Sequence, residues 1–308
     1  MYQELRMRAL VALPAVAVAA LLTVTTAGCS QQQPNTEHGT ANVVASTDVW
    51  GSVATAVVGD HATVKPIVSG TVADPHSFEA SPSDVAEIAD ASLVLYNGDH
   101  YDHWIEDVLQ NSPDIPTIDA SSLSPTQPPP NEHVFYDLPT VKAVADHIAE
   151  TLGQADAEHA ADYTANAQKF GDDLDTLTLA QRGIGEAHPG ASVVSTEPVA
   201  YYALRNAGIE DKTPPSFANA VEEGGDPSPG DLAAVLDLIN NRQVSAIVVN
   251  TQTEGPVSKQ LSDAARRAVL PVISVTETLP DGMDYLRWQR KTVDEIAAAL
   301  DSPAPPGR

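Results

Sequence analysis

The chain has 308 residues, with 42 acidic residues against 16 Lys and Arg, so its formal charge at pH 7 is −26 with histidine neutral. Because phosphate contacts need clustered Lys and Arg, this balance excludes a typical nucleic-acid-binding protein. A single cysteine excludes a disulfide framework and a zinc finger, and 43% hydrophobic residues over this length predict a full core, arranged as two lobes.

Residues 1–28 are predicted to be an export signal. Arg6 and Arg8 precede an uncharged apolar run, which ends in small residues directly before Cys29, the only cysteine. Such a run is long enough to be tested as a transmembrane helix, but the small-residue exit and the polar stretch behind it favour a cleaved signal. The segment resembles a bacterial lipoprotein signal, in which Cys29 is lipidated; plain secretion and an uncleaved anchor are the alternatives.

Cleavage before Cys29 removes a net charge of +1 and leaves −27 on the mature chain. Acyl chains on Cys29 would hold the protein at a membrane surface, on the outer face of the cytoplasmic membrane. Residues 29–41 are polar, with Pro34 and Gly39 and no apolar period, which is typical of a flexible tether.

Strands alternating with helices are predicted in the first half of the mature chain. Ser81-Pro82-Ser83-Asp84 is a helix start, with a capping Ser, a Pro in the first turn and a carboxylate three residues after the Ser. The expected strands cover residues 42–47, 63–68 and 92–96, with a short one near 115–119 and a helix over 49–58.

The same plan recurs in the second half. Ser228-Pro229-Gly230-Asp231 starts a helix that leads to an apolar strand over 245–249, and further strands are expected over 192–196 and 271–275. Alternating strands and helices imply parallel sheets with helices on both faces. The sequence therefore predicts two similar α/β lobes.

One long helix is predicted to join the lobes. Residues 155–186 contain no proline, and five apolar side chains recur there at spacings of three and four: Tyr163, Ala167, Phe170, Leu174 and Leu177. The expected organisation is a signal over 1–28, a tether over 29–41, an N-terminal lobe over 42–153, a linking helix over 154–187, a C-terminal lobe over 188–302 and a tail over 303–308.

Four side chains that can bind metal follow predicted strands. The sequence contains no GxSxG, HExxH, P-loop or GxGxxG motif, which weakens an enzyme interpretation. Ligands of open parallel sheets bind outside the carboxyl ends of the strands, where His76, His133, Glu197 and Glu277 are expected. Taken singly, each is better explained as a solvated or hydrogen-bonded His or as a helix-capping Glu, so the hypothesis of a metal site rests on the combination of the four.

Nearly the whole mature chain resembles the metal-binding lipoproteins of zinc and manganese ABC importers, the cluster A-I solute-binding proteins. The most specific stretch is DPHSFEASPSDVAEIADASLVLYNGDHYDHW, from Asp74 to Trp104. HVFYDLPTV, SVVSTEPVAYYALRNAGI, DPSPGDLAAVLDLI and VTETLPDGMDYLRW look like later regions of the family. Two departures are Glu277 in place of the family's usual Asp, and Asn131-Glu132 in place of Asp-Pro before His133.

The resemblance implies His76, His133, Glu197 and Glu277 as the four ligands of a transported ion. It also implies a non-catalytic, monomeric receptor that delivers a divalent metal to an ABC permease with its cytoplasmic ATPase. Carboxylate oxygens favour harder ions, so Mn²⁺ is preferred to Zn²⁺ as the cargo, although Zn²⁺ outranks Mn²⁺ in affinity at almost any site of N and O ligands. His100 and His103 are a weaker second cluster, with a solvated helix start as the alternative.

Two other functions stay open from the sequence. A receptor of the same architecture for an organic ligand, such as an iron chelate or cobalamin, would need aromatic residues and Arg in its cleft. A metal-dependent hydrolase with Glu79 as its base would need an open position in the metal's ligand shell for water.

Overall fold

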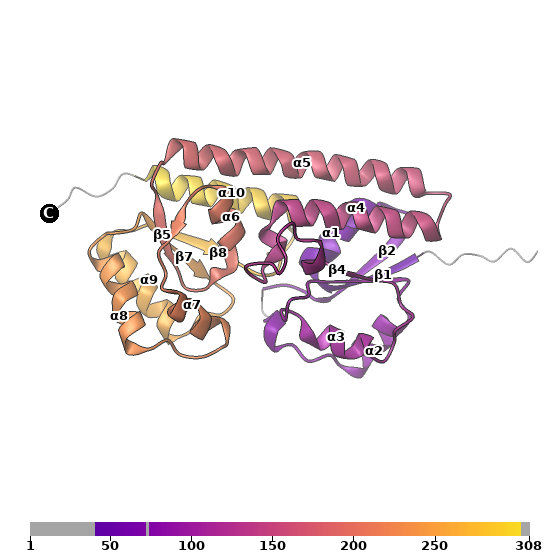
Figure 1. Ribbon diagram of the computed structural model, residues 1–308, viewed down its shortest axis with the longest axis horizontal. Coiled ribbons are helices and arrows are strands. Elements are labelled where there is room, and N and C mark those ends of the chain that lie inside the picture. The colour runs from indigo at the N-terminus through magenta and orange to yellow at the C-terminus, as the bar shows by residue number, and fades with distance from the viewer. Residues whose placement is uncertain (1–40, 72–73, 303–308) are drawn as a thin grey trace, which may run out of the picture. The chain divides into compact units, whose positions relative to one another are not determined.

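Two parallel four-stranded sheets, each flanked by helices, make up residues 41–71 and 74–302, the part of the chain that this computed structural model describes (Figure 1). All of these residues belong to one contact unit of the chain. The predicted signal, the lipidation site Cys29 and the tail over 303–308 lie outside the described residues. The predicted tether over 29–41 also lies outside the described residues, apart from its last residue, Ala41. In the structure Ala41 is the first residue of a strand.

The first sheet has the strand order β2-β1-β3-β4, all parallel. Each predicted strand of this half is present, with its ends shifted by no more than two residues. The strands are β1 (Ala41–Thr47), β2 (Ala62–Val68), β3 (Leu93–Tyr96) and β4 (Thr117–Asp119), and the helices are α1 (Asp48–Val58), α2 (Pro82–Ala89), α3 (His103–Leu109) and α4 (Leu138–Ala155).

The second sheet repeats this order as β6-β5-β7-β8, which confirms the prediction of two similar lobes. Its β6 has only two residues and was not predicted. The strands are β5 (Ser192–Ser195), β6 (Glu210–Asp211), β7 (Ala246–Asn250) and β8 (Val272–Val275), and the helices are α6 (Tyr201–Asn206), α7 (Pro215–Glu222), α8 (Pro229–Asn240), α9 (Pro256–Ala268) and α10 (Tyr285–Asp301).

Both predicted helix starts are capped as their sequences require. The Ser81 hydroxyl accepts from the backbone N–H of Asp84, and the Asp84 carboxylate accepts in return from the Ser81 N–H at 2.8 Å. In the second lobe, Ser228 accepts from the N–H of Asp231 at 3.1 Å. These local bonds satisfy N–H groups that would otherwise have no partner in the first helical turn.

A 28-residue helix, α5 (Ala160–Ala187), runs past both sheets (Figure 1). It contacts α1 and α4 on the first lobe and α6 and α10 on the second, and the five predicted stripe residues are buried. Its predicted start at 154 was wrong, because α4 continues to Ala155. The helical conformation is interrupted after Ala155. There the Asp156 carboxylate accepts hydrogen bonds from His159 Nδ1 at 2.7 Å and from the Tyr163 hydroxyl at 2.9 Å.

One apolar core extends under both sheets. It joins β1 and β3 to β5, β7 and β8 through buried faces of α1, α4, α5 and α10. Two smaller clusters lie on the opposite sheet faces, under α2 and α3 in the first lobe and under α8 and α9 in the second. Among the described helices, none combines the length and the apolar character needed to cross a bilayer.

Candidate metal-binding site

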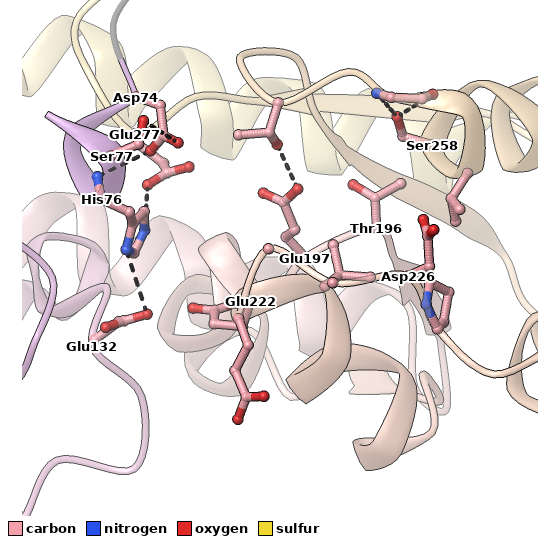
Figure 2. Close-up of a pocket in the computed structure, with 18 of the residues that line it drawn as sticks. Asp74, His76, Ser77, Glu132, Thr196, Glu197, Glu222, Asp226, Ser258 and Glu277 are labelled. Carbon is pink, nitrogen blue, oxygen red and sulfur yellow. Dashed lines mark hydrogen bonds and ion pairs between the residues drawn. The ribbon is translucent and has the colours of Figure 1, made fainter.

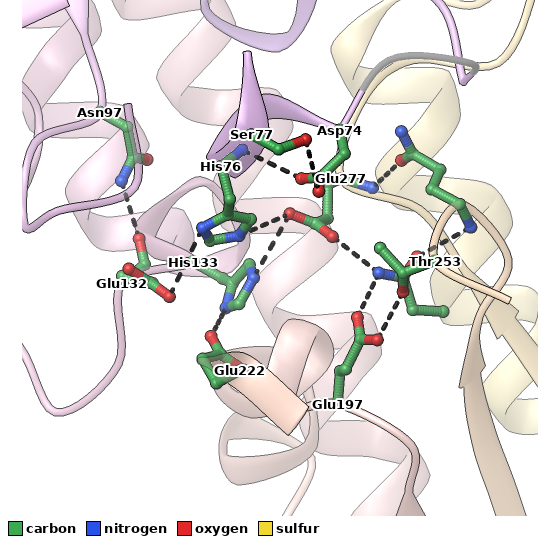
Figure 3. A network of polar contacts seen from close by, with 12 residues as sticks. Asp74, His76, Ser77, Asn97, Glu132, His133, Glu197, Glu222, Thr253 and Glu277 are labelled. Atoms are coloured by element: carbon green, nitrogen blue, oxygen red, sulfur yellow. Dashed lines mark hydrogen bonds and ion pairs between the residues drawn. The ribbon is translucent and has the colours of Figure 1, made fainter. Parts of the chain in front are cut away.

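Glu277 lies at the centre of a polar network that contains all four predicted ligands, and His76 and His133 lie directly beside its carboxylate (Figure 3). Its Oε2 is 3.1 Å from His76 Nε2 and 3.6 Å from His133 Nε2. The two histidines come from the first lobe and Glu277 from the second, two residues after β8. Side chains 144 and 201 residues apart in sequence therefore meet where the carboxyl ends of the strands face each other.

The hydrogen bonds of His133 fix which of its ring nitrogens is free. Asn131 Oδ1 accepts from the backbone N–H of His133 at 3.0 Å, so the same oxygen accepts from Nδ1, also at 3.0 Å. The proton of the neutral ring therefore lies on Nδ1. In this neutral form Nε2 carries the lone pair; the atom is buried and has no hydrogen-bond partner among the described residues. A buried lone pair beside a carboxylate is the arrangement that a cation satisfies.

His76 is held by a short 3₁₀ helix, Pro75–Ser77, that follows β2. Asp74 caps this helix, accepting from the His76 N–H at 3.0 Å and from the Ser77 hydroxyl at 3.0 Å. The ring packs edge-on against buried Tyr101, with 4.6 Å between centroids. These contacts hold the imidazole in one orientation.

The loop that carries His133 is fastened to the second lobe by three tyrosines. Tyr202 of α6 donates to the Asn131 carbonyl at 2.6 Å, and Tyr285 of α10 donates to the Phe135 carbonyl at 2.6 Å. Tyr136 of the loop donates in turn to the Thr276 carbonyl, next to Glu277, at 2.9 Å. These bonds fix the position of His133 relative to Glu277.

Glu197, the fourth predicted ligand, directly precedes a 3₁₀ helix, Pro198–Ala200, and reaches the cluster through an amide. Asn250 Nδ2 donates to Glu197 Oε2 at 2.5 Å and to Glu277 Oε1 at 2.6 Å. The other oxygen of Glu197 accepts from the Thr253 hydroxyl at 2.5 Å. The structure therefore joins Glu197 to Glu277 through Asn250, while His76 and His133 contact Glu277 itself.

Two further carboxylates, which the sequence analysis did not select, face the outer nitrogens of the imidazoles (Figure 3). Glu132 Oε1 is 4.0 Å from His76 Nδ1, and Glu222 Oε1, at the end of α7, is 3.5 Å from His133 Nδ1. Glu132 also offers an oxygen that lies within 4.8 Å of ligand atoms of both histidines. Its only signal in the sequence was its place beside His133; for Glu222 there was none.

The cluster opens into a cavity of about 670 Å³ that is lined from both lobes (Figure 2). Among the described residues that line it, seven are acidic, four are histidines and none is Lys, Arg, Phe, Tyr or Trp. His100 and His103, the weaker second cluster, are both exposed and line this same cavity. Glu79 is exposed and is not one of the lining residues.

Burial and neighbouring charges shift the proton affinities of the cluster. Burial lowers the pKa of His76, but the hydrogen bond and charge of Glu277, with Glu132 and Asp74, raise it to about 9. Burial would raise the pKa of Glu277, yet its contacts with His133 and His76 hold it below the usual range. Burial raises the pKa of Glu197, against bonds from Thr253 and Asn250, and burial with nearby Glu132 raises that of Glu222.

Two similar parallel-sheet lobes, joined by a long helix and lining one cavity, are the architecture of two-lobed solute-binding proteins. The family model described as "Zinc-uptake complex component A periplasmic" matches residues 43–299. The chain belongs to this family, whose members are solute-binding proteins. This confirms the resemblance found in the sequence.

Individual proteins are similar to this chain over most of its length. The manganese-binding lipoprotein MntA of Halalkalibacterium halodurans is 27% identical over 248 residues, 73% of this chain and 76% of that protein. The iron-binding protein YfeA of Yersinia pestis is 23% identical over 89% of this chain and 91% of its own length. The solved structure of the periplasmic zinc-binding protein TroA from Treponema pallidum shares the fold, with a TM-score of 0.73 and 21% identity over 85% of this chain and 99% of that one.

Proposed function

We propose that the protein captures a divalent transition metal ion outside the cytoplasm and delivers it to an ABC import permease. The ligands are His76, His133, Glu197 and Glu277. The observation that carries this proposal is the buried, unpartnered Nε2 of His133, 3.6 Å from Glu277 Oε2 in a cleft between the lobes. An ion between these atoms would pair the lone pair and neutralise the carboxylate.

The charges around the cluster support a cation as the cargo. Two carboxylates neutralise a divalent ion, which offsets the free-energy cost of removing it from water. The seven acidic residues that line the cavity make it attractive to cations and repulsive to anions. An organic ligand would need aromatic or Arg contacts, and the described lining residues supply neither.

Mn²⁺ is the proposed physiological cargo, in preference to Zn²⁺. The ligand set contains two carboxylates, and Glu132 offers a further oxygen within 4.8 Å of ligand atoms of both histidines. Oxygen-rich shells of five or six contacts suit Mn²⁺, whereas Zn²⁺ favours four ligands in a tetrahedron. The relatives' names include manganese, iron and zinc, so the ligand chemistry carries this preference.

The sequence and the name of a relative support a place of action outside the cytoplasm. Cys29 is proposed to carry the lipid anchor, after removal of residues 1–28, and to hold a monomeric receptor on the outer face of the cytoplasmic membrane. MntA, which is similar to this chain, is named a lipoprotein. The proposed partners are the permease in that membrane and its cytoplasmic ATPase.

Single Ala substitutions of the four ligands test the site. Each of His76→Ala, His133→Ala, Glu197→Ala and Glu277→Ala is expected to weaken Mn²⁺ binding by at least about 100-fold in competition titrations with a fluorescent chelator. His188→Ala and Glu150→Ala are matched controls: His188 pairs with Asp301 outside the cleft, Glu150 is exposed on α4, and both variants should bind as the parent does. Parent-like Mn²⁺ and Zn²⁺ affinity in the ligand variants would refute the site.

A further inference from the structure

We propose that Asn250 is a positioning residue that sets the separation of the two C-terminal-lobe carboxylates and thereby the preference of the site for Mn²⁺ over Zn²⁺. The inference rests on the proposed function. Asn250 is 1% exposed and ends β7, the strand between β5 and β8. Its Nδ2 donates to Glu197 Oε2 at 2.5 Å and to Glu277 Oε1 at 2.6 Å.

Strand register places Asn250 between the two carboxylates. In the parallel pair of β5 and β7, Ser195 lies opposite Val248, so continuing by two residues puts Glu197 beside Asn250. In the pair of β7 and β8, Asn250 lies opposite Val275, two residues before Glu277. Neighbouring strands are about 4.8 Å apart, so the flanking strands are separated by roughly twice that distance. One amide on the central strand spans this separation.

The remaining bonds of Asn250 leave the amide no freedom to turn. Its Oδ1 accepts from the N–H of Gln252 at 3.1 Å, and its backbone N–H donates to the Thr196 hydroxyl at 3.0 Å. Ionised carboxylates only accept, so the NH₂ group must face Glu197 and Glu277, and each of its two hydrogens has one acceptor. The orientation of the side chain follows from its neighbours.

Holding both carboxylates by one nitrogen has a consequence for metal choice. One oxygen of Glu277 is bound to Asn250, which turns the other toward the imidazoles, and Glu197 is fixed between Asn250 and Thr253. Zn²⁺ binds more tightly than Mn²⁺ at most sites of N and O ligands, so discrimination must come from geometry. A fixed spacing opposes contraction to a compact tetrahedron around Zn²⁺ and suits the larger, oxygen-rich shell of Mn²⁺.

The test is the ratio of Mn²⁺ to Zn²⁺ affinity in the full chain, purified in detergent. Asn250→Ala removes both N–H donors of the side chain, and Asn250→Ser leaves one hydroxyl donor on a shorter side chain. We expect Asn250→Ala to weaken Mn²⁺ binding by about tenfold or more while Zn²⁺ affinity changes by less than about threefold, with a smaller shift for Asn250→Ser. The electron paramagnetic resonance spectrum of bound Mn²⁺ should change with the ratio. Gln181→Ala, which removes an equally buried amide of α5, should leave the ratio unchanged.

The outcomes separate this inference from the proposed function. Equal weakening of both metals, or no weakening, in either variant with a native circular dichroism spectrum would overturn the positioning role while leaving the site intact. Asn250→Ser decides the matter if Asn250→Ala does not fold. Failure of the parent protein to bind either ion would overturn the proposed function, and this inference with it.

Discussion

At the scale of single residues, a proton occupies part of the site when no metal is bound. His76 donates through Nε2 to Glu277 Oε2 at 3.1 Å, and its pKa of about 9 keeps the ring charged at neutral pH. A charged imidazole cannot bind a metal, so an ion at the proposed site would have to displace this proton. The proposed site thereby couples metal binding to pH through His76 Nε2.

Metal affinity should therefore rise with pH up to about 9 and then level off. The protonated form of His76 dominates below that pKa, so each unit fall in pH should weaken binding by about tenfold from this group alone. Competition titrations from about pH 6 to 8, with calorimetry in two buffers of different ionisation enthalpy, measure the slope and the protons released. Affinity that is independent of pH, with no proton release, would contradict this role for His76.

Residues that follow a strand could be selected from the sequence, whereas residues brought close by contacts between the lobes could not. His76, His133 and Glu277 follow predicted strands, so a pattern in the sequence selected them. Glu222 meets His133 only because α7 of one lobe lies against a loop of the other. No spacing within either segment encodes that approach, so this carboxylate could not be predicted from the sequence.

At the scale of elements, α5 is fitted closely to the second lobe. A Cβ placed on Gly185 would lie 2.0 Å from the carbonyl oxygen of Ala207, which follows α6, so only glycine permits this approach. On the same helix, Gly183 is exposed and has nothing within 4 Å of such a Cβ. The two glycines therefore lie on one helix, but only Gly185 packs against another part of the backbone.

Gly185→Ala should lower the free energy of unfolding by about 1–3 kcal/mol, because the methyl group must push α6 away from α5. Gly183→Ala should instead raise it by about 0.5–1 kcal/mol, since alanine in an exposed helix position loses less backbone entropy. Urea unfolding monitored by circular dichroism measures both. Similar effects in the two variants would show that α5 does not dock closely on α6.

Elements with strong local signals could be predicted, and those defined by tertiary contacts could not. Ser81 and Ser228 start their helices through bonds within four residues, so their positions were read from the sequence. The break before α5 has no Pro or Gly; it depends on side-chain bonds from His159 and Tyr163 to Asp156. The two-residue strand β6 exists only by pairing with β5.

At the scale of the whole described chain, a common apolar core and several hydrogen bonds join the two lobes, in addition to the helix α5. A single apolar core passes under both sheets, and the Asp48 carboxylate of α1 accepts from the N–H groups of Gly70 at 2.7 Å and Leu279 at 3.0 Å. Thr278 donates from the second lobe to the Gly70 carbonyl at 3.0 Å. Thr278 and Leu279 directly follow Glu277, so these contacts hold the segment that carries Glu277 against the first lobe.

The central claim is that four side chains from two lobes bind one ion. Crystals of the protein loaded with Mn²⁺, measured for anomalous scattering at the manganese edge, test it directly. We predict one strong peak in the cleft, within about 2.0–2.6 Å of His76 Nε2, His133 Nε2 and carboxylate oxygens of Glu277 and Glu197. A peak bound by other residues, or no peak in the cleft at saturating Mn²⁺, would contradict the claim.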